Sequence, residues 1–385
     1  MINICFVLDS YPKKTSNGCV FAKHLIWAIA DKGYKCTVIA PRPITLNSLK
    51  NKNNEEKKRI DVTDKGNKIE VYTPFYLHLS SNRRFMKNSM NNHFKAVRKI
   101  MKTYDISPDI MYGHFIYQCG LTVSRIGKIL NIPSYCACGE NSLRLEKDSH
   151  PYCTGLKYCN WKEILKNFEV VISVSSNNSD LLIRNGFIDN NKKMSVFPNG
   201  INKDKFYVMD KNKARKKLGL PLDAYIVAYT GTFKESKGII ELSEALKSCE
   251  NTYSMFMGKG HLSPDCDNIL YCGSVPNDEL HIYLNAADVF VLPTKGEGCC
   301  NAIVEALACG LPVISSDLPF NDDILNESNS IRVDVNSVYQ IENAIKKLRD
   351  DSELYNTLKK GAVLSAEKLS INVRAENILR FMGLV

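Results

Sequence analysis

Short apolar runs alternate with helix-forming stretches along the whole chain. Runs of this kind, bounded by glycine, proline and polar residues, are typical of buried parallel strands. In the first half, strands are predicted over residues 3–8, 35–40, 68–72, 110–112, 134–138, 170–174 and 194–197. In the second half, they are predicted over residues 225–229, 253–257, 269–271, 289–292, 313–315 and 330–333. Helices are predicted between them, for example over 20–32 and 120–130, so the pattern predicts an α/β fold with parallel sheets.

The length of 385 residues suits two domains of ordinary size. The run of strands and helices predicts a Rossmann-like domain over residues 1–199 and a second one over 200–365, joined near Gly200. The tail over residues 366–382 also has a helical pattern. We therefore expect the chain to end in a helix that lies within 366–385.

The most informative stretch is residues 297–318, EGCCNAIVEALACGLPVISSDL, which follows the predicted strand at 289–292. Its pattern predicts a turn and then a helix over 301–309. A helix N-terminus at the carboxyl end of a parallel strand suits an anion such as a diphosphate. Glu297 and Glu305 flank this turn and can accept hydrogen bonds from the ribose and sugar hydroxyls of a nucleotide-sugar. Taken alone, the pair fits an ordinary loop glutamate and a solvated helix glutamate somewhat better.

Several further motifs follow one another in a fixed order. They are FPNGIN (197–202), AYTGTFKESKG (228–238), GSVP (273–276) and LNAADVF (284–290). Together with 297–318, this order resembles that of the retaining GT-B glycosyltransferases of family 4, strongly in the C-terminal half and loosely in the N-terminal half. The resemblance implies an acceptor-binding first domain and a donor-binding second domain that face each other across a cleft. It also implies that the last helix packs back on the first domain.

The resemblance implies roles for individual residues of the second domain. Glu297 and Lys237 would be catalytic, with Lys237 binding the departing diphosphate as a point charge. The family often has an arginine directly after the glycine of the phosphate loop, and this chain has Thr232 there. Lys234 is then the alternative source of a second positive charge. The implied donor-binding residues are Gly231, Thr232, Lys234, Val275, Gly298, Cys299, Cys300, Asn301 and Glu305.

In the first domain, the resemblance points to two places after predicted strands. His114, in YGHF, matches a family histidine near the transferred sugar and would be catalytic, although a lone histidine is more often structural. Gly18 and Asn17 would lie in the acceptor-side loop, where the family often has two glycines. The family frequently has a second histidine where this chain has Cys138, so a sugar contact from that position is in doubt.

Positive charge is concentrated in one part of the chain, whose formal net charge is +10. Residues 47–102 hold 14 Lys and Arg against 5 Asp and Glu, and residues 83–102 interleave basic with apolar positions. Such a pattern predicts a basic amphipathic helix suited to an anionic membrane surface or a partner groove. A solvated helix face is the plain alternative. No nucleic acid is expected as a partner, because no nucleic-acid-binding motif accompanies the charge.

Other functional classes are disfavoured by the remaining sequence. No apolar run approaches the roughly 18–20 residues that span a bilayer, and the first residues have the pattern of a strand without a basic leader. The 14 cysteines are expected to be free thiols in a reducing cytoplasm, without zinc-ligand spacing. We expect no metal and no cofactor beyond a nucleotide-diphosphate sugar.

The leading hypothesis is a metal-independent retaining glycosyltransferase of the cytoplasm, peripheral to the inner face of the cell membrane. Its acceptor would be a lipid-linked or growing glycan of a cell-surface polysaccharide. Two alternatives stay open, a sugar-nucleotide 2-epimerase and a catalytically degenerate GT-B partner protein.

Overall fold

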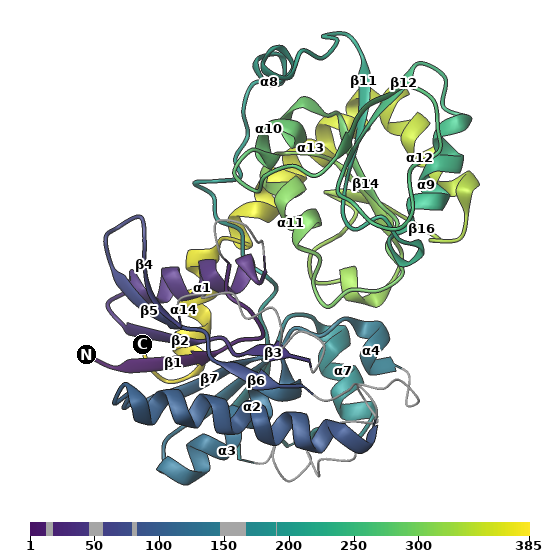
Figure 1. Cartoon of the computed structure of the whole chain (residues 1–385). Coiled ribbons are helices and arrows are strands. Elements are labelled where there is room, and N and C mark those ends of the chain that lie inside the picture. The colour runs from purple at the N-terminus through teal and green to yellow at the C-terminus, as the bar shows by residue number, and fades with distance from the viewer. Residues whose placement is uncertain (13–17, 46–56, 79–82, 147–166, 190) are drawn as a thin grey trace. The chain divides into compact units, whose positions relative to one another are not determined.

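The computed structural model describes residues 1–12, 18–45, 57–78, 83–146, 167–189 and 191–385 (Figure 1). The chain divides into two compact units, residues 1–197 with 374–385 and residues 198–373. The boundary at 197 and 198 lies two residues from the predicted one. The end of the chain groups with the N-terminal unit.

The N-terminal unit contains an eight-stranded sheet in the order β10-β9-β8-β7-β1-β2-β5-β4 and a small β3-β6 sheet. Figure 1 shows α2 and α3 on one side of the large sheet and α1 and α14 on the other. The strands are β1 Asn3–Val7, β2 Lys35–Ile39, β3 Arg42–Ile44, β4 Lys58–Val62, β5 Lys68–Tyr72, β6 Phe75–Leu77, β7 Ile110–His114, β8 Ser134–Cys138, β9 Val170–Ser173 and β10 Met194–Val196. The helices are α1 Val20–Ala30, α2 Arg83–Thr103, α3 Leu121–Leu130, α4 Ser142–Glu146, α7 Ser176–Arg184 and α14 Ile371–Phe381.

The C-terminal unit is a six-stranded, fully parallel sheet in the order β13-β12-β11-β14-β15-β16. Helices α9 and α12 cover one face, and α10, α11 and α13 cover the other (Figure 1). The strands are β11 Tyr225–Thr230, β12 Thr252–Met257, β13 Ile269–Gly273, β14 Val289–Leu292, β15 Val313–Ser316 and β16 Ser330–Val333. The helices are α8 Lys211–Leu218, α9 Ile239–Lys247, α10 Leu280–Ala286, α11 Asn301–Ala308, α12 Val338–Asp350 and α13 Ser352–Lys368.

Every predicted strand is present, but three strands were missed. β3 and β6 are only three residues long, and β4 is an edge strand that pairs with β5 in antiparallel fashion. The prediction of a wholly parallel first sheet was therefore wrong at this edge. The side chains of β4 are half-buried or exposed, so the strand lacks the continuous apolar run that marks a central parallel strand.

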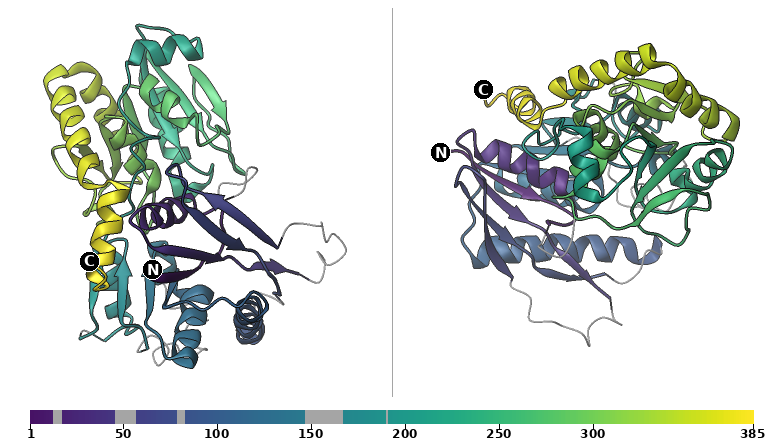
Figure 2. Two further views of the ribbon diagram at one scale, coloured as in Figure 1. Left: turned by 90° about the vertical axis from the view of Figure 1, so that its left-hand side faces the viewer. Right: turned by 90° about the horizontal axis from the view of Figure 1, so that it is seen from above.

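The single helix predicted for the tail is two helices, α13 and α14, which can be followed in yellow in Figure 2. The break lies at Leu369 and Ser370, where the backbone pairs with Ile201 in a parallel bridge. The Ile201 N–H donates to the Leu369 carbonyl at 2.8 Å, and the Ile371 N–H donates to the Ile201 carbonyl at 2.9 Å. A Cβ at Gly200 would lie 2.7 Å from the Ile371 Cα, so glycine is required for this approach.

Residues 83–103 form a helix, α2, but its apolar side is not free. Met90, Phe94, Val97, Ile100 and Met101 belong to the hydrophobic core of the N-terminal unit. These apolar positions are therefore explained by packing within the N-terminal unit, and binding of this helix to an anionic membrane surface stays a prediction. Lys87, Lys95, Lys99 and Lys102 are exposed on the same helix, and so is Phe85, which is 38% exposed.

Candidate active site

The loop between β14 and α11 supplies the centre of the candidate site. β14 is fully buried and ends at Leu292, and α11 begins at Asn301. Cys300 is the N-cap residue and makes no side-chain capping hydrogen bond. The first N–H groups of a helix have no partner within the helix, so an uncapped N-terminus presents donors and the positive end of the helix dipole.

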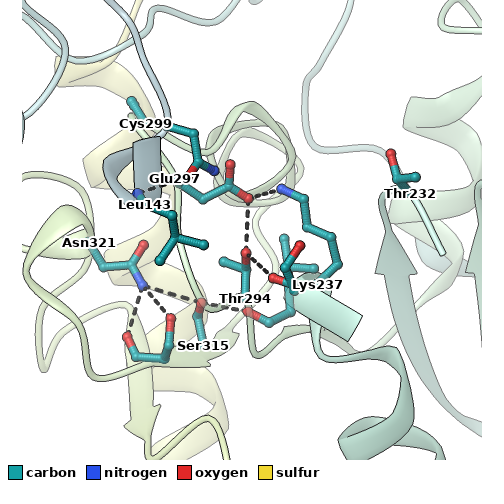
Figure 3. Close-up of polar contacts among 12 residues, drawn as sticks. Leu143, Thr232, Lys237, Thr294, Glu297, Cys299, Ser315 and Asn321 are labelled. Atoms are coloured by element: carbon teal, nitrogen blue, oxygen red, sulfur yellow. Dashed lines mark hydrogen bonds and ion pairs between the residues drawn. The ribbon is translucent and has the colours of Figure 1, made fainter. Parts of the chain in front are cut away.

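Lys237 and Glu297 are brought together from two loops that follow neighbouring strands, β11 and β14 (Figure 3). The Lys237 ammonium forms an ion pair with Oε1 of Glu297, and the Thr294 hydroxyl donates to the same oxygen at 3.1 Å. The two side chains are 17% and 13% exposed, so water screens the pair only partly. The predicted catalytic lysine and glutamate thus lie in direct contact.

Electrostatics keep the ammonium of Lys237 charged. Burial alone would lower the pKa of Lys237, but the charge of Glu297 and the hydrogen bond to Glu297 outweigh it. The pKa of Lys237 is therefore raised above its ordinary value. Burial also raises the pKa of the Cys300 thiol, so Cys300 is a neutral thiol at the start of α11.

Backbone contacts fix the two loops against each other. The Lys295 N–H and the Thr294 hydroxyl both donate to the Ser236 carbonyl, at 2.9 and 3.2 Å. Gly238 has a φ of 67°, and a Cβ there would lie 2.2 Å from the Pro293 carbonyl oxygen. Only glycine fits this close approach, which explains why the FKESKG loop has a glycine at position 238.

The end of β14 is held from the other side by β15. The Ser315 hydroxyl donates to the Leu292 carbonyl at 2.7 Å, and Figure 3 shows Asn321 close to Ser315. The Asn321 amide donates to the Ser316 carbonyl at 2.8 Å. The loop that carries Glu297 therefore starts from a rigid strand end, as a preorganised site requires.

Asn199, in the PNG motif, anchors the start of α11. Its side-chain amide donates to the Cys299 carbonyl at 3.3 Å and to the Asn301 Oδ1 at 2.9 Å. The Asn199 backbone N–H points to the Cys299 Sγ at 3.2 Å. Cys299 is therefore a buried loop anchor, and the amide nitrogen of Asn301 is left as the hydrogen-bond donor predicted for the phosphates.

Glu305 differs from its expected state. It lies on α11, and burial raises the pKa of its carboxyl to about 8. The carboxylate predicted to accept ribose hydroxyls is therefore mostly protonated at neutral pH in the structure. Ionisation of Glu305 requires a partner that stabilises the charge.

The remaining predicted donor residues lie at the carboxyl ends of neighbouring strands. Gly231 follows β11 and its N–H donates to the Met257 carbonyl at 3.0 Å; Gly298 is buried before α11. Thr232 is exposed, and Val275 is half-buried in the turn after β13. Lys234 is half-buried and forms no ion pair within the described parts of the chain.

His114 ends β7 in the N-terminal unit and is 1% exposed. Burial, reinforced by the charge of Arg374, lowers the pKa of its imidazole to about 3, so the ring is neutral. Neither ring nitrogen has a hydrogen-bond partner among the residues described. A Cβ at Gly139 would lie 2.8 Å from Nε2, so the ring lies directly against that backbone.

The other residues predicted in the N-terminal unit are less well placed. Gly18 precedes α1, and a Cβ there would lie 2.6 Å from the Ser10 Oγ. Asn17 lies outside the described residues. Cys138 is fully buried in the core, which leaves no exposed side chain at the position of the family's second histidine.

Sequence reasoning missed Thr294, Lys295 and Glu241, which all contact the two loops. Lys295 forms an ion pair with Glu241 at 2.7 Å. The signal was present as spacing, because Lys295 lies two positions before Glu297 and Glu241 lies four positions after Lys237. Nothing in the sequence says which lysine pairs with which glutamate.

Comparisons with known proteins point to glycosyltransferases. The family model of the glycosyl transferases group 1 matches residues 210–363. The chain is 27% identical over 355 residues to TuaC of Bacillus subtilis, a glycosyltransferase assigned to teichuronic acid biosynthesis, covering 90% of this chain and 89% of TuaC. It is 30% identical over 219 residues to the Escherichia coli UDP-Gal:alpha-D-GlcNAc-diphosphoundecaprenol alpha-1,3-galactosyltransferase, covering 50% of this chain and 55% of that protein.

Solved structures match over the whole chain. The sucrose-phosphate synthase of Thermosynechococcus elongatus has a TM-score of 0.77 at 18% identity and covers 100% of this chain and 98% of its own. HepE of Anabaena, in complex with UDP and glucose, has a TM-score of 0.72 at 13% identity and covers 100% of both chains. These likenesses establish the GT-B fold. Residues 210–363 match the family model of the glycosyl transferases group 1, and the chain as a whole has the GT-B fold.

Proposed function

We propose that the protein is a retaining glycosyltransferase that moves a sugar from a nucleotide-diphosphate sugar onto a lipid-linked or growing glycan of a cell-surface polysaccharide. The observation that carries the proposal is the contact between Lys237 and Glu297 beside the uncapped N-terminus of α11. The two loops together offer a positive charge and N–H donors, which suit a diphosphate, and a carboxylate, which suits the hydroxyls of the attached sugar.

Each group then has a distinct task. The Lys237 ammonium and the first N–H groups of α11 stabilise the charge that develops on the leaving diphosphate. When Lys237 turns to the phosphate, Glu297 becomes free to accept hydrogen bonds from the sugar. The departing phosphate takes the proton of the acceptor hydroxyl, so attack on the same face retains the anomeric configuration.

His114 stays a prediction within this proposal. A neutral imidazole with two unpaired ring nitrogens can donate one hydrogen bond and accept one, as recognition of a sugar hydroxyl requires. Its lowered pKa makes it a poor general acid or base at neutral pH. We therefore propose that it binds the sugar without exchanging protons.

The acceptor class follows from the relatives' names. TuaC is assigned to teichuronic acid, the Escherichia coli relative to a diphosphoundecaprenol-linked sugar, and CapM of Staphylococcus aureus to capsular polysaccharide. A glycan that is built on a lipid carrier is common to such pathways. We propose an acceptor of that kind, reached from the cytoplasmic side of the membrane.

Attachment to the membrane is proposed as electrostatic. None of the helices in the described ranges is long and apolar enough to cross a bilayer. The apolar side of α2 is buried, but Lys87, Lys95, Lys99 and Lys102 on the same helix are exposed. Such lysines are attracted to anionic headgroups without insertion of apolar side chains.

Metal independence is also proposed, because Lys237 and the α11 N-terminus already place positive charge where a divalent cation would act. The rate of sugar transfer should stay unchanged when a chelator is added in about tenfold molar excess over the divalent metal in the assay. Loss of transfer that Mg²⁺ or Mn²⁺ restores would contradict this part of the proposal.

The proposal as a whole is tested by titration with UDP- and GDP-sugars, followed by a donor screen on detergent-solubilised lipid acceptors read by mass spectrometry. Binding of one nucleotide-sugar and a mass gain of one sugar on the acceptor are expected. A degenerate partner protein would bind none of the donors. An epimerase would convert the donor without an acceptor.

A further inference from the structure

A second ion pair joins the two loops that carry Lys237 and Glu297. The Lys295 ammonium lies 2.7 Å from Oε1 of Glu241. Lys295 belongs to the loop of Glu297, and Glu241 lies in the first turn of α9, directly after the loop of Lys237. The β14–α11 loop thus contributes Lys295 and Glu297, and the segment after β11 contributes Lys237 and, on α9, Glu241.

The Lys295–Glu241 pair is more than a surface contact. The Glu241 side chain is 15% exposed, and its second oxygen, Oε2, is buried without a hydrogen-bond partner in the part of the chain that is described. With Oε2 buried and unpaired, the carboxylate depends on Lys295 for most of its stabilisation, although water still reaches part of the pair. Lys295 is also held through its backbone, whose N–H donates to the Ser236 carbonyl at 2.9 Å.

The four charges have a second pairing that would disable the site. Lys295 and Glu297 are two positions apart on one loop, and Lys237 lies four positions before Glu241, which is on α9. If Lys295 paired with Glu297, the carboxylate proposed to bind the sugar would be occupied by a residue that cannot leave for the phosphate. Glu241 removes this competitor by holding Lys295 away.

We infer that Glu241 and Lys295 are positioning residues, which keep Glu297 paired with Lys237 and hold the two donor loops in register. They touch neither the diphosphate nor the sugar and act only through Lys237 and Glu297. This inference rests on the proposed function of those two residues. The Lys237–Glu297 pair and the N-terminus of α11 do not by themselves hold the two loops in register, and Glu241 and Lys295 would do this.

The test compares Glu241→Gln with a matched control, Glu342→Gln. The control removes a carboxylate from the Lys346–Glu342 pair of α12, which has a similar distance of 2.6 Å and similar exposures of 36% and 19%, against 32% and 15% for Lys295–Glu241. Glu241→Gln should weaken binding of UDP about tenfold, since a small displacement of positioned groups is costly. Hydrogen exchange at the Lys295 amide should rise in Glu241→Gln and not in Glu342→Gln.

A charge-reversed pair, Glu241→Lys with Lys295→Glu, separates positioning from simple loss of stability. It restores one cation and one anion, so UDP affinity and Lys295 exchange should return to within about threefold of wild type. Unchanged affinity and exchange in Glu241→Gln would overturn the inference. So would equal losses in Glu342→Gln, or a reversed pair that recovers thermal stability but not affinity.

Failure of the proposed function gives a different result. If the wild-type protein binds UDP but transfers no sugar, the transferase proposal fails while affinity and exchange still decide the role of Glu241. If the wild-type protein binds neither UDP nor GDP, hydrogen exchange at the Lys295 amide alone tests the positioning role of Glu241. Unchanged exchange in Glu241→Gln then overturns the positioning role.

Discussion

Lys237 and Glu297 neutralise each other in the absence of a donor. The pair is largely buried, so the ammonium is held by the carboxylate and not by water. A diphosphate must compete with Glu297 for the lysine, and this exchange of partners lowers the net gain on binding. The carboxylate that is released by the exchange is then available to the sugar.

Removing each partner should therefore have opposite effects on nucleotide binding. Lys237→Ala should weaken UDP binding, whereas Glu297→Gln should tighten it, because the lysine no longer has a competing anion. Both variants should lose about 10²–10³-fold in transfer rate, since each removes a preorganised contact of the transition state. Calorimetric titration with UDP and initial-rate measurements check the two effects separately.

Transfer within about threefold of wild type for either variant would contradict the site assignment. If Glu297→Gln binds UDP more weakly than wild type, the assignment of the site still stands. The idea that Glu297 competes with the diphosphate for Lys237 is then refuted. Circular dichroism is the control for folding, since Lys237 ends a short 3-10 helix and Glu297 lies in a loop, both after the carboxyl ends of strands.

Glu305 should make stability depend on pH. Its pKa is about 8 in the folded protein, above the ordinary value of 4.5, so the folded state holds an extra proton between these values. The stability that this proton contributes is complete below about pH 4.5 and is lost as the pH rises to 8. The Gln side chain of Glu305→Gln does not titrate. The melting temperature of this variant, relative to that of wild type, should therefore rise as the pH increases from 5 to 8.

A constant difference in melting temperature over this range would show that Glu305 does not titrate there. A ribose contact can be tested with the same variant. Hydroxyl donors favour the carboxylate, so UDP binding by wild type should strengthen as the pH rises through 8. The affinity of Glu305→Gln should be flat with pH.

At the scale of single residues, the sequence predicted which groups matter better than it predicted their states. The order of the motifs indicated Lys237 and Glu297, and the structure places them in contact. It could not indicate that Glu305 is protonated or that His114 has an unpaired, neutral ring, because these states depend on burial by residues far apart in the chain. Lys295 and Glu241 were missed for the same reason.

Among the elements, the glycine at the start of α9 offers a sharp test of loop packing. Gly238 and Gly219 both have a φ of 67°, but a Cβ at Gly219 meets no atom within 4 Å. Gly219→Ala should cost about 1–2 kcal/mol of stability from backbone strain alone. Gly238→Ala should cost roughly 1–3 kcal/mol more, because its Cβ would overlap the Pro293 carbonyl.

Chemical denaturation of the two variants measures this difference, and UDP titration reports whether the loop has moved. Equal destabilisation by the two changes would mean that the approach of Gly238 to Pro293 contributes nothing. A Gly238→Ala variant that keeps wild-type UDP affinity would separate the packing of the loop from its function.

The elements themselves were predictable where local pattern and tertiary environment agree. Buried parallel strands such as β8 and β14 are continuous apolar runs, and they were predicted at the correct residues. β4 and the break between α13 and α14 were not predictable, since each is determined by pairing with a distant segment, β5 and Ile201 respectively. The pattern of α2 was read correctly as a helix, but the pattern alone cannot say whether its apolar side faces a core or a membrane.

For the whole molecule, the net charge of +10 raises the question of where an anionic surface would bind. The exposed lysines Lys95, Lys99 and Lys102 share one side of α2, at intervals of four and three residues. If these lysines alone hold the protein on a bilayer, salt should release it completely, because the apolar side chains of the buried face are not available to insert.

Charge reversal of Lys95, Lys99 and Lys102 to glutamate should therefore weaken co-sedimentation with anionic vesicles roughly a hundredfold, at about 1 kcal/mol for each lysine lost. The matched control reverses Lys213, Lys216 and Lys217, which are exposed on α8 of the other unit and change the net charge equally. If the control releases the protein to the same extent, total charge and not α2 governs binding. Sedimentation that resists 0.5 M salt, where the screening length falls to roughly 4 Å, would instead require an apolar anchor such as Phe85, which is 38% exposed on α2.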